Sequence, residues 1–194
     1  MTPDGAQGVV DQLFAAFARL GDRHYGEEVT QTEHMLQTAA LAERARASGA
    51  LVVAALLHDY GHFLHDPDGE VTGQAEVDAR HEHLAADFLA AWFPPAVVRP
   101  IALHVAAKAY LCAARPGYRA SLSEASRQSL ALQGGPLDAS GMERFLADPF
   151  ARDAVALRRW DDAAKVPGAS TRTLEDYRDT IIAVMTAERP EAEG

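Results

Sequence analysis

The sequence predicts an all-α fold, a single-domain helical bundle. Apolar residues recur at three- and four-residue steps through most of the chain, which is the period of an amphipathic helix. No stretch of the sequence shows the sustained apolar–polar alternation of a half-buried strand. The 194 residues, 48% of them hydrophobic, suffice for one compact domain with its own core. We expect one domain over residues 1–194, with a core over about 8–187 and loose ends.

Three helices are expected before residue 60. The first ends at Gly21, and its apolar face is formed by Val9, Leu13, Phe14, Phe17 and Leu20. The second covers residues 29–47 and stops at Ser48-Gly49. The continuous apolar run at 51–57 could be a strand or a buried helix. Alanine and leucine outnumber its two valines, which favours a helix.

The rest of the chain alternates between helical patterns and turn residues. Pro94-Pro95 ends one helix, and a long helix begins near Pro95 or Pro100. Turn or loop residues occupy 66–69, 115–117 and 133–136. The remaining helices are expected over 76–92, 123–132, 142–146, 150–160 and 174–187.

Composition and charge exclude several classes of protein. With 18 basic and 28 acidic residues the net charge is −10, which disfavours binding to nucleic acid. The longest apolar run is far shorter than the roughly twenty residues of a membrane span, and the first residues lack the basic segment of a signal peptide. The single cysteine, Cys112, cannot form an internal disulfide, which is typical of a reducing cytosol. We therefore expect a cytoplasmic protein with no nucleic-acid or membrane partner and no obligate protein partner.

Histidines and an aspartate occur where the helices should be buried. His58-Asp59 ends the most apolar stretch, where ionisable groups are costly to bury, and His34 and His104 lie within amphipathic helices. One histidine on an apolar face is usually a core residue, and His58-Asp59 could be a helix end that reaches solvent. Several imidazoles and a carboxylate on separate helices instead indicate a transition-metal site inside the bundle. A structural zinc site and an iron–sulfur cluster are disfavoured because the cysteine ligands are missing.

The residues after His58 suggest close packing at this point. A helix through them would put His58 and His62 on one face, with Asp59 about 100° around the axis. Gly61 leaves room for another backbone or a ligand to approach.

His34, His58-Asp59 and a late aspartate resemble the signature of the HD-domain superfamily, which contains metal-dependent phosphohydrolases and related oxygenases. The similarity extends over residues 8–180 to the diiron oxygenases that cleave organophosphonates, and to the members that form glycine from 2-amino-1-hydroxyethylphosphonate. The blocks that carry it are Gly26-Glu27, Gln31-x-Glu33-His34-x-Leu36-Gln37, Ala54-Ala55-Leu56-Leu57-His58-Asp59-x-Gly61-His62, His81-Glu82, His104-Val105-Ala106-Ala107-Lys108, Leu132-Gln133-Gly134-Gly135-Pro136 and Arg158-x-Trp160-Asp161.

The resemblance implies a site for two iron ions, Fe(II) and Fe(III), with O2 as co-substrate. Asp59 would bridge the two ions, because each carboxylate oxygen can bind a metal. The implied ligands are His34, His58 and Asp161 for one ion, and His81 and His104 for the other.

Neighbouring residues leave some of these choices open. Spacing alone does not separate Asp161 from Asp162, but the Arg-x-Trp-Asp pattern favours Asp161. His81 matches the family position, whereas His83 and His65 are expected to be ordinary polar residues.

The resemblance also implies a pocket for the substrate. In the family, the phosphonate is bound by the residues that match His62, Lys108, Ser126 and Arg158. A residue that matches Gln133 helps to line the pocket. A dianionic phosphonate requires several cationic or hydroxyl donors, which these side chains supply. Asp59, His62 and Lys108 are the expected catalytic residues.

The amine end of the pocket departs from the family pattern. The family has a tyrosine two positions before its Gly-Glu pair, whereas here that position is His24 and the tyrosine is Tyr25. Tyr25 and Glu27 are nevertheless expected to contact the substrate, since a carboxylate attracts a cationic nitrogen. The shift could admit a trimethylammonium group, which aromatic rings and carboxylates can surround.

The resemblance therefore implies O2-dependent cleavage of the C–P bond of a 1-hydroxy-2-(amino or trimethylammonio)ethylphosphonate, giving glycine or glycine betaine and inorganic phosphate. The alternative is an HD-type metal-dependent phosphohydrolase that acts on a nucleotide or another phosphate ester. A third hypothesis, a non-catalytic metal or ligand sensor, is disfavoured because all six implied ligand positions are filled.

Overall fold

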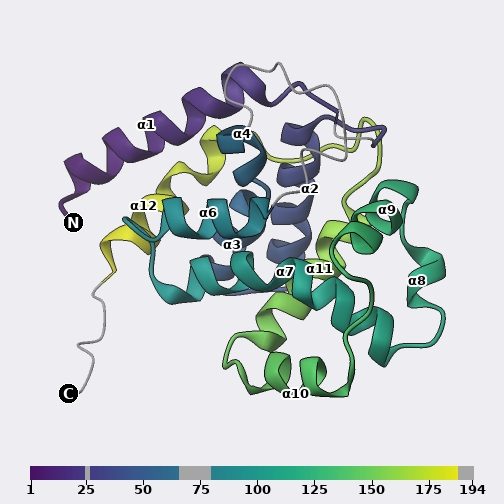
Figure 1. The fold of residues 1–194 in the computed structure, drawn as a ribbon. Coiled ribbons are helices and arrows are strands. Elements are labelled where there is room, and N and C mark those ends of the chain that lie inside the picture. The colour runs from purple at the N-terminus through teal and green to yellow at the C-terminus, as the bar shows by residue number, and fades with distance from the viewer. Residues whose placement is uncertain (25–26, 66–79, 188–194) are drawn as a thin grey trace, which may run out of the picture.

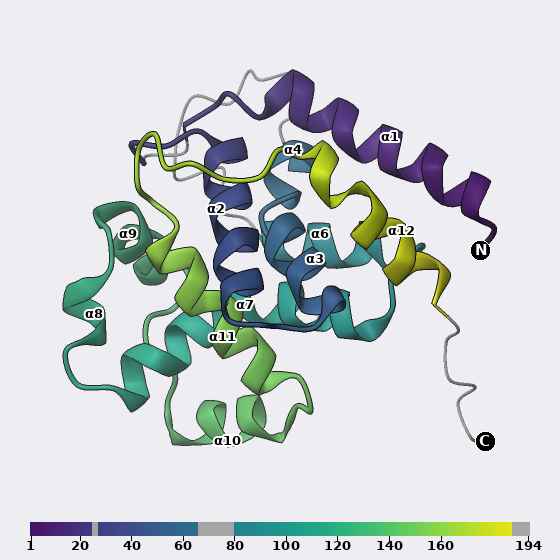
Figure 2. The ribbon, with the colours of Figure 1, turned by 180° about the vertical axis from the view of Figure 1, so that it is seen from behind.

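The computed structural model describes residues 1–24, 27–65 and 80–187, and every regular element in these ranges is helical (Figures 1 and 2). The prediction of an all-α fold is therefore confirmed. The helices are α1 (Pro3–Leu20), α2 (Gln31–Arg44), α3 (Gly49–Leu57), α4 (Gly61–His65), α6 (His81–Leu89), α7 (Pro95–Ala114), α8 (Tyr118–Ser121), α9 (Glu124–Leu132), α10 (Ala139–Ala147), α11 (Ala151–Ala163), the 3-10 helix η1 (Glu175–Tyr177) and α12 (Arg178–Thr186).

Helices α2, α3, α7 and α11 form the centre of the bundle. α7 packs against α3, α6 and α11, and α2 packs against α3 and α11. Figures 1 and 2 show α1 and α12 at one end of this group and α8, α9 and α10 at the other. The main core runs from α1 through α3 to α12, and a smaller cluster around Phe145 fills the space between α7, α10 and α11. The centre of the bundle is thus enclosed on several sides by helices.

Capping residues set the helix boundaries more tightly than periodicity predicted. The Thr30 hydroxyl accepts a hydrogen bond from the Glu33 backbone N–H, and the Glu33 carboxylate accepts one from the Thr30 N–H. This capping box starts α2 at Gln31 rather than at the expected residue 29. The side chains of Ser48, Ser123 and Asp138 cap α3, α9 and α10, and each accepts a hydrogen bond from one backbone N–H of the first helical turn. α6 begins at His81, and residues 76–79 of the expected helix lie outside the described residues, as does the expected turn at 66–69.

The run at 51–57 is a buried helix, as predicted, but this helix does not continue through His62. α3 ends at Leu57, residues 58–60 form a turn, and α4 starts at Gly61. His58 and His62 therefore belong to different elements rather than to one helix face. A Cβ on Gly61 would lie 1.9 Å from the His81 carbonyl oxygen, so glycine is needed where the two backbones meet. The expected close approach at Gly61 is that of a backbone.

Helix α7 starts at Pro95, with Pro100 inside it, and is the one described helix long and apolar enough to cross a membrane. It packs within the bundle against α3, α6 and α11, and its His104 and Lys108 are buried there. A core helix of a bundle passes the same test of length and composition, and these contacts show that α7 is one. α4 and α8 are short helices that the sequence pattern did not predict.

Candidate metal centre

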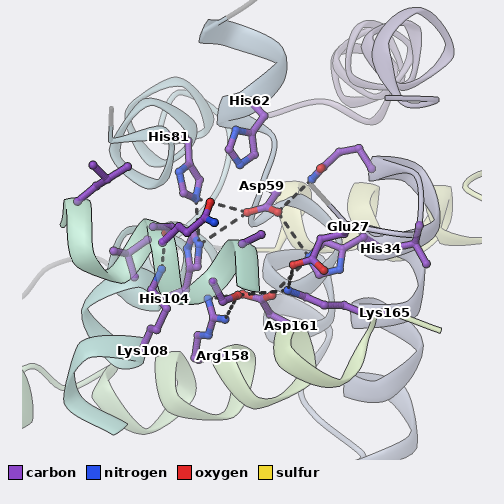
Figure 3. Close-up of a pocket in the computed structure, with 18 residues that line it drawn as sticks. Glu27, His34, Asp59, His62, His81, His104, Lys108, Arg158, Asp161 and Lys165 are labelled. Carbon is purple, nitrogen blue, oxygen red and sulfur yellow. Dashed lines mark hydrogen bonds and ion pairs between the residues drawn. The ribbon is translucent and has the colours of Figure 1, made fainter. Parts of the chain in front are cut away.

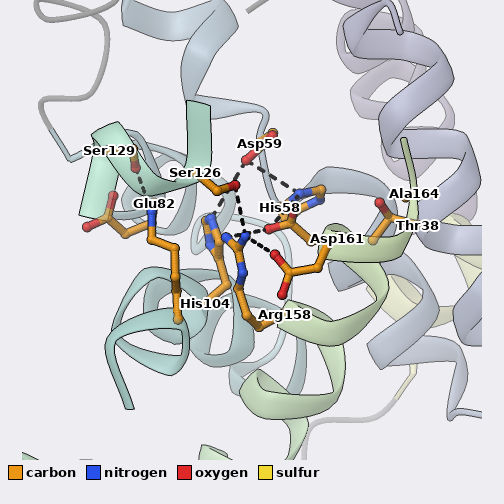
Figure 4. Close-up of polar contacts among 12 residues, drawn as sticks. Thr38, His58, Asp59, Glu82, His104, Ser126, Ser129, Arg158, Asp161 and Ala164 are labelled. Atoms are coloured by element: carbon orange, nitrogen blue, oxygen red, sulfur yellow. Dashed lines mark hydrogen bonds and ion pairs between the residues drawn. The ribbon is translucent and has the colours of Figure 1, made fainter. Parts of the chain in front are cut away.

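Six side chains from separate parts of the chain meet where α2, α3, α6, α7 and α11 converge; Figure 3 shows five of them and Figure 4 shows His58. All of them are buried except Asp59, whose side chain is 14% exposed. The six are His34 on α2, His58 and Asp59 after α3, His81 at the start of α6, His104 on α7 and Asp161 on α11.

The first half of the cluster consists of His34, His58 and Asp161. The Nε2 atoms of the two imidazoles lie 3.3 Å apart. Asp161 Oδ1 lies 3.4 Å from His34 Nε2, and Asp161 Oδ2 lies 3.9 Å from His58 Nε2. Asp162, the alternative that spacing left open, points elsewhere and is bonded to Tyr118 and Arg158. The geometry therefore places Asp161 rather than Asp162 in the cluster.

The second half consists of His81 and His104, whose Nε2 atoms lie 3.2 Å apart. The His62 ring stacks on the His81 ring with centroids 4.2 Å apart. One ring nitrogen of His62, one of His81 and one carboxylate oxygen of Asp59 all lie within 4.8 Å of one another. Behind His81, the buried Glu82 carboxylate lies 3.7 Å from His81 Nδ1. A carboxylate behind an imidazole is typical of metal-ligating histidines.

Asp59 lies between the two halves. Its Oδ2 is 3.5 Å from His34 Nε2, and its Oδ1 is 3.4 Å from His58 Nε2 and 3.5 Å from His81 Nε2. Oδ1 is also 3.7 Å from His104 Nε2. Each carboxylate oxygen thus faces imidazole nitrogens, which is the arrangement that a bridging ligand requires.

The outer nitrogens of three imidazoles are fixed by backbone carbonyl oxygens. His34 Nδ1 is 2.9 Å from Ala164 O, His58 Nδ1 is 2.9 Å from Ala55 O, and His104 Nδ1 is 2.8 Å from Ile101 O. A carbonyl only accepts, so each Nδ1 carries the hydrogen and donates it, and each Nε2 turns a lone pair inward. Facing lone pairs about 3 Å apart repel each other unless a cation or a proton lies between them. These donors fit a metal ion at each histidine pair.

Electrostatics favours neutral imidazoles at His58 and His104 beside ionised carboxylates. At His34 burial lowers the pKa, but the Asp161 and Asp59 carboxylates outweigh it and raise the pKa to about 10. Burial lowers the pKa of His58 and of His104 below the usual value for histidine. Burial alone would raise the pKa of Asp161, but the Arg158 guanidinium, 2.8 Å away, holds it well below its usual range. The His58 imidazole likewise keeps the pKa of Asp59 low against the effect of burial. Neutral imidazole and carboxylate are the forms that bind divalent transition metals.

A cavity of about 290 Å³ opens beside the cluster. Lys108, Arg158 and Lys165 line it, so three cationic side chains face one small space (Figure 3). Lys108 Nζ donates to Ser129 Oγ over 2.5 Å, and Arg158 Nη2 donates to Ser126 Oγ over 3.3 Å (Figure 4). Clustered cations and hydroxyls of this kind suit a phosphonate or phosphate dianion.

The expected substrate contacts are only partly at this cavity. His62, Lys108, Ser126, Arg158 and Glu27 line it. Gln133 caps the C-terminal end of α9 and is not among the lining side chains. Tyr25 lies outside the described residues.

The histidines that were expected to be ordinary lie away from the cluster. The His83 side chain is 57% exposed, and His65 is half-buried at the end of α4. His24, which stands at the family's tyrosine position, is exposed, and its Nδ1 lies 3.3 Å from the Glu27 backbone oxygen.

Comparison with known proteins identifies the family. The HD domain model matches residues 32–151 of this chain. The chain belongs to the HD-domain family. Over 172 residues this HD protein is 44% identical to a hydroxymethylphosphonate dioxygenase of Gimesia maris, covering 89% of this chain and 86% of that protein. Over 158 residues it is 42% identical to the glycine-betaine-forming 1-hydroxy-2-(trimethylamino)ethylphosphonate dioxygenase of Leisingera caerulea, covering 81% and 80% of the two chains.

A third relative of this HD protein has no stated activity. It is an uncharacterized protein of Acanthamoeba polyphaga mimivirus, 34% identical over 175 residues that cover 89% of this chain and 80% of that protein. The resemblance to HD oxygenases of organophosphonate catabolism that the sequence motifs carried is confirmed by the two dioxygenases.

Two residues at this HD site had no role in the sequence analysis. Gln31 Nε2 donates to Asp59 Oδ2 over 3.0 Å, although Gln31 appeared there only as part of a motif block. Lys165 forms an ion pair with Glu27 at the cavity, and it follows the last predicted motif with no periodic pattern to mark it. Both contacts join residues far apart in sequence, so only the fold reveals them.

Proposed function

We propose that the chain catalyses the O2-dependent cleavage of the C–P bond of a 1-hydroxyphosphonate at a centre of two iron ions, Fe(II) and Fe(III). The carboxylate and phosphate products contain all atoms of the phosphonate and one O2, so no further reductant is needed. The observation that carries the proposal is the pairing of two donor clusters, joined by Asp59, with a cavity lined by cationic side chains. The relatives that are phosphonate dioxygenases support it.

His34, His58 and Asp161 would hold one ion, and His81 and His104 the other, with Asp59 between them. Bound iron would supply the redox chemistry with O2 and would make the substrate hydroxyl more acidic. Lys108 and Arg158 neutralise the phosphonate oxygens, and Ser126 donates a hydrogen bond to them. His62, which stacks on His81 and lines the cavity, would contact the substrate next to the second ion.

The substituent on the second carbon is a finer question. The family resemblance implies an amino group, with glycine as product, and the shift of the tyrosine from position 24 to Tyr25 could admit a trimethylammonio group, with glycine betaine as product. The relative from Gimesia maris is named for a substrate with no second carbon at all. The substrates to assay are therefore hydroxymethylphosphonate, 2-amino-1-hydroxyethylphosphonate and 1-hydroxy-2-(trimethylammonio)ethylphosphonate. The cytoplasmic location stays a prediction.

The test measures oxygen uptake and phosphate release together, with protein loaded with iron under anaerobic conditions. We expect one O2 consumed for each phosphate released from at least one of these substrates, and no phosphate without O2. Phosphate released from the phosphonates or from nucleotides without O2 would contradict the proposal and favour the hydrolase.

A further inference from the structure

Lys165 lies beside the carboxylate that was expected to hold the substrate's cationic group. Lys165 Nζ forms an ion pair and hydrogen bond with Glu27 Oε1. Ser123 Oγ donates to the same Oε1 over 2.7 Å, and Lys165 Nζ lies 3.2 Å from the Oγ atoms of Ser123 and Ser126. The Lys165 and Glu27 side chains are only 17% and 22% exposed. The Glu27 carboxylate therefore already has a cationic partner at the cavity.

The backbone on both sides of Lys165 is held in place. Ala164 O accepts the hydrogen bond from His34 Nδ1 over 2.9 Å. The Gln37 side chain donates to Val166 O over 2.9 Å and accepts from Val166 N over 3.1 Å. Lys165 thus projects from a segment tied to α2 at both neighbours, and its ammonium is a built part of the cavity wall (Figure 3).

A quaternary ammonium group would bind weakly next to Glu27. Next to Glu27 it would face the Lys165 ammonium, and like charges repel strongly in a partly desolvated space. A trimethylammonium group makes no hydrogen bonds and binds best against aromatic faces. Among the described residues that line the cavity there is no Phe, Tyr or Trp, and the apolar lining is Val29, Val105, Ala125 and Leu132. Tyr25 lies outside the described residues, so we base the inference on Lys165.

We propose that Lys165 determines substrate specificity, because its ion pair with Glu27 takes the place of a substrate's cationic group. The substrate class is then a 1-hydroxyphosphonate whose substituent is uncharged or absent. This proposal rests on the proposed phosphonate function, and it narrows the substituent that the sequence alone predicted.

The test is anaerobic binding, because binding separates specificity from turnover. Three phosphonates without a 1-hydroxyl group serve as probes: methylphosphonate, 2-(trimethylammonio)ethylphosphonate and its uncharged isostere 3,3-dimethylbutylphosphonate. Titration calorimetry of the metal-loaded protein gives the three dissociation constants. We expect the natural protein to bind the uncharged isostere at least tenfold more tightly than the cation of the same shape.

Matched variants identify the lysine as the cause. Lys165→Met keeps the length of the side chain and removes the charge, and it should shift the preference at least tenfold toward the cation. Lys165→Arg should keep the natural preference, and adding Glu27→Gln to Lys165→Met should abolish the shift. Circular dichroism and the melting temperature verify that each variant is folded.

The outcomes separate this inference from the proposed function. An unchanged preference in Lys165→Met, a natural preference for the cation, or no binding of any probe would overturn the role of Lys165. If no 1-hydroxyphosphonate is cleaved but the binding preference shifts as expected, the proposed function fails while the role of Lys165 in the cavity stands.

Discussion

The Nε2 atoms of His34 and His58 face each other at 3.3 Å, while the Nδ1 atom of each ring is bonded to a backbone carbonyl oxygen. The carbonyls leave the inner nitrogens with lone pairs and no hydrogen to share. Only a cation or a proton relieves that contact. Burial lowers the pKa of His34, but the carboxylates of Asp161 and Asp59 more than offset this effect and raise it to about 10.

Metal uptake should release a proton from His34. Because its pKa of about 10 lies above neutral pH, the metal-free protein carries the proton at pH 7, and a metal ion must displace it. The apparent metal affinity should therefore rise about tenfold for each unit by which the pH is raised, as long as the pH stays below 10. Calorimetric titration with Fe(II) under anaerobic conditions, in buffers of different ionisation enthalpy, counts the protons released. An affinity that is independent of pH between 6.5 and 8.5 would contradict this expectation.

Replacing His104 should remove one of two metal positions. His104→Ala leaves only His81 and Asp59 on that side, so we expect the loss of one iron per chain and of turnover. The helical content should be kept, with a loss of stability of about 1–3 kcal/mol for a buried side chain. Metal analysis and circular dichroism measure both effects. His83→Ala removes an exposed imidazole and should change neither. Unchanged iron content in His104→Ala would show that the ligand assignment is wrong.

Adding a methyl group at Gly61 should displace His81. The new Cβ would lie 1.9 Å from the His81 carbonyl oxygen, so the start of α6 must move. Gly61→Ala should destabilise the fold by about 1–3 kcal/mol and weaken metal binding at the His81–His104 pair. Gly8→Ala is the control. No atom other than the neighbouring helix backbone lies within 4 Å of the Cβ position there, so the substitution should stabilise α1 by about 0.5–1 kcal/mol. Chemical denaturation gives both values, and equal effects at the two positions would contradict the prediction.

A negative charge at position 31 should weaken metal binding by Asp59, the expected bridging ligand. Gln31 Nε2 donates to Asp59 Oδ2 over 3.0 Å, and Gln31→Glu replaces that donor with a second carboxylate. We expect metal affinity to fall about 10–100-fold, as is usual when such a supporting partner is lost. Competition with a chelator measures this, and Gln12→Glu on the exposed face of α1 provides the same charge change away from the site. Equal affinity in the two variants would show that Gln31 does not support Asp59.

The sequence predicted those features that depend on local pattern. The apolar periodicity found the long helices, and the excess of alanine and leucine at 51–57 identified α3 correctly. The break after Leu57 was not predicted, because it depends on Gly61 meeting the His81 backbone, which is a contact between distant segments. α4 and α8 are too short to show a period.

The candidate site divides in the same way. Motif resemblance singled out the six side chains that the structure brings together, including Asp161 rather than Asp162. The motif resemblance gave no signal for Lys165. Its position depends on the two hydrogen bonds between the Gln37 side chain and the Val166 backbone, and these residues are far apart in sequence. From the sequence, the Glu27 carboxylate was expected to bind a cationic group of the substrate, but in the structure this carboxylate is paired with Lys165.

The iron content and oxidation states of the chain, reconstituted with Fe(II) and then exposed to O2 so that one iron of each pair is oxidised, test the central claim most directly. Mössbauer spectroscopy combined with metal analysis should find two iron ions per chain, stable as one Fe(II) and one Fe(III), and Asp59→Asn should lose this coupled pair. A single iron per chain that Asp59→Asn leaves in place would contradict a centre of two ions bridged by Asp59.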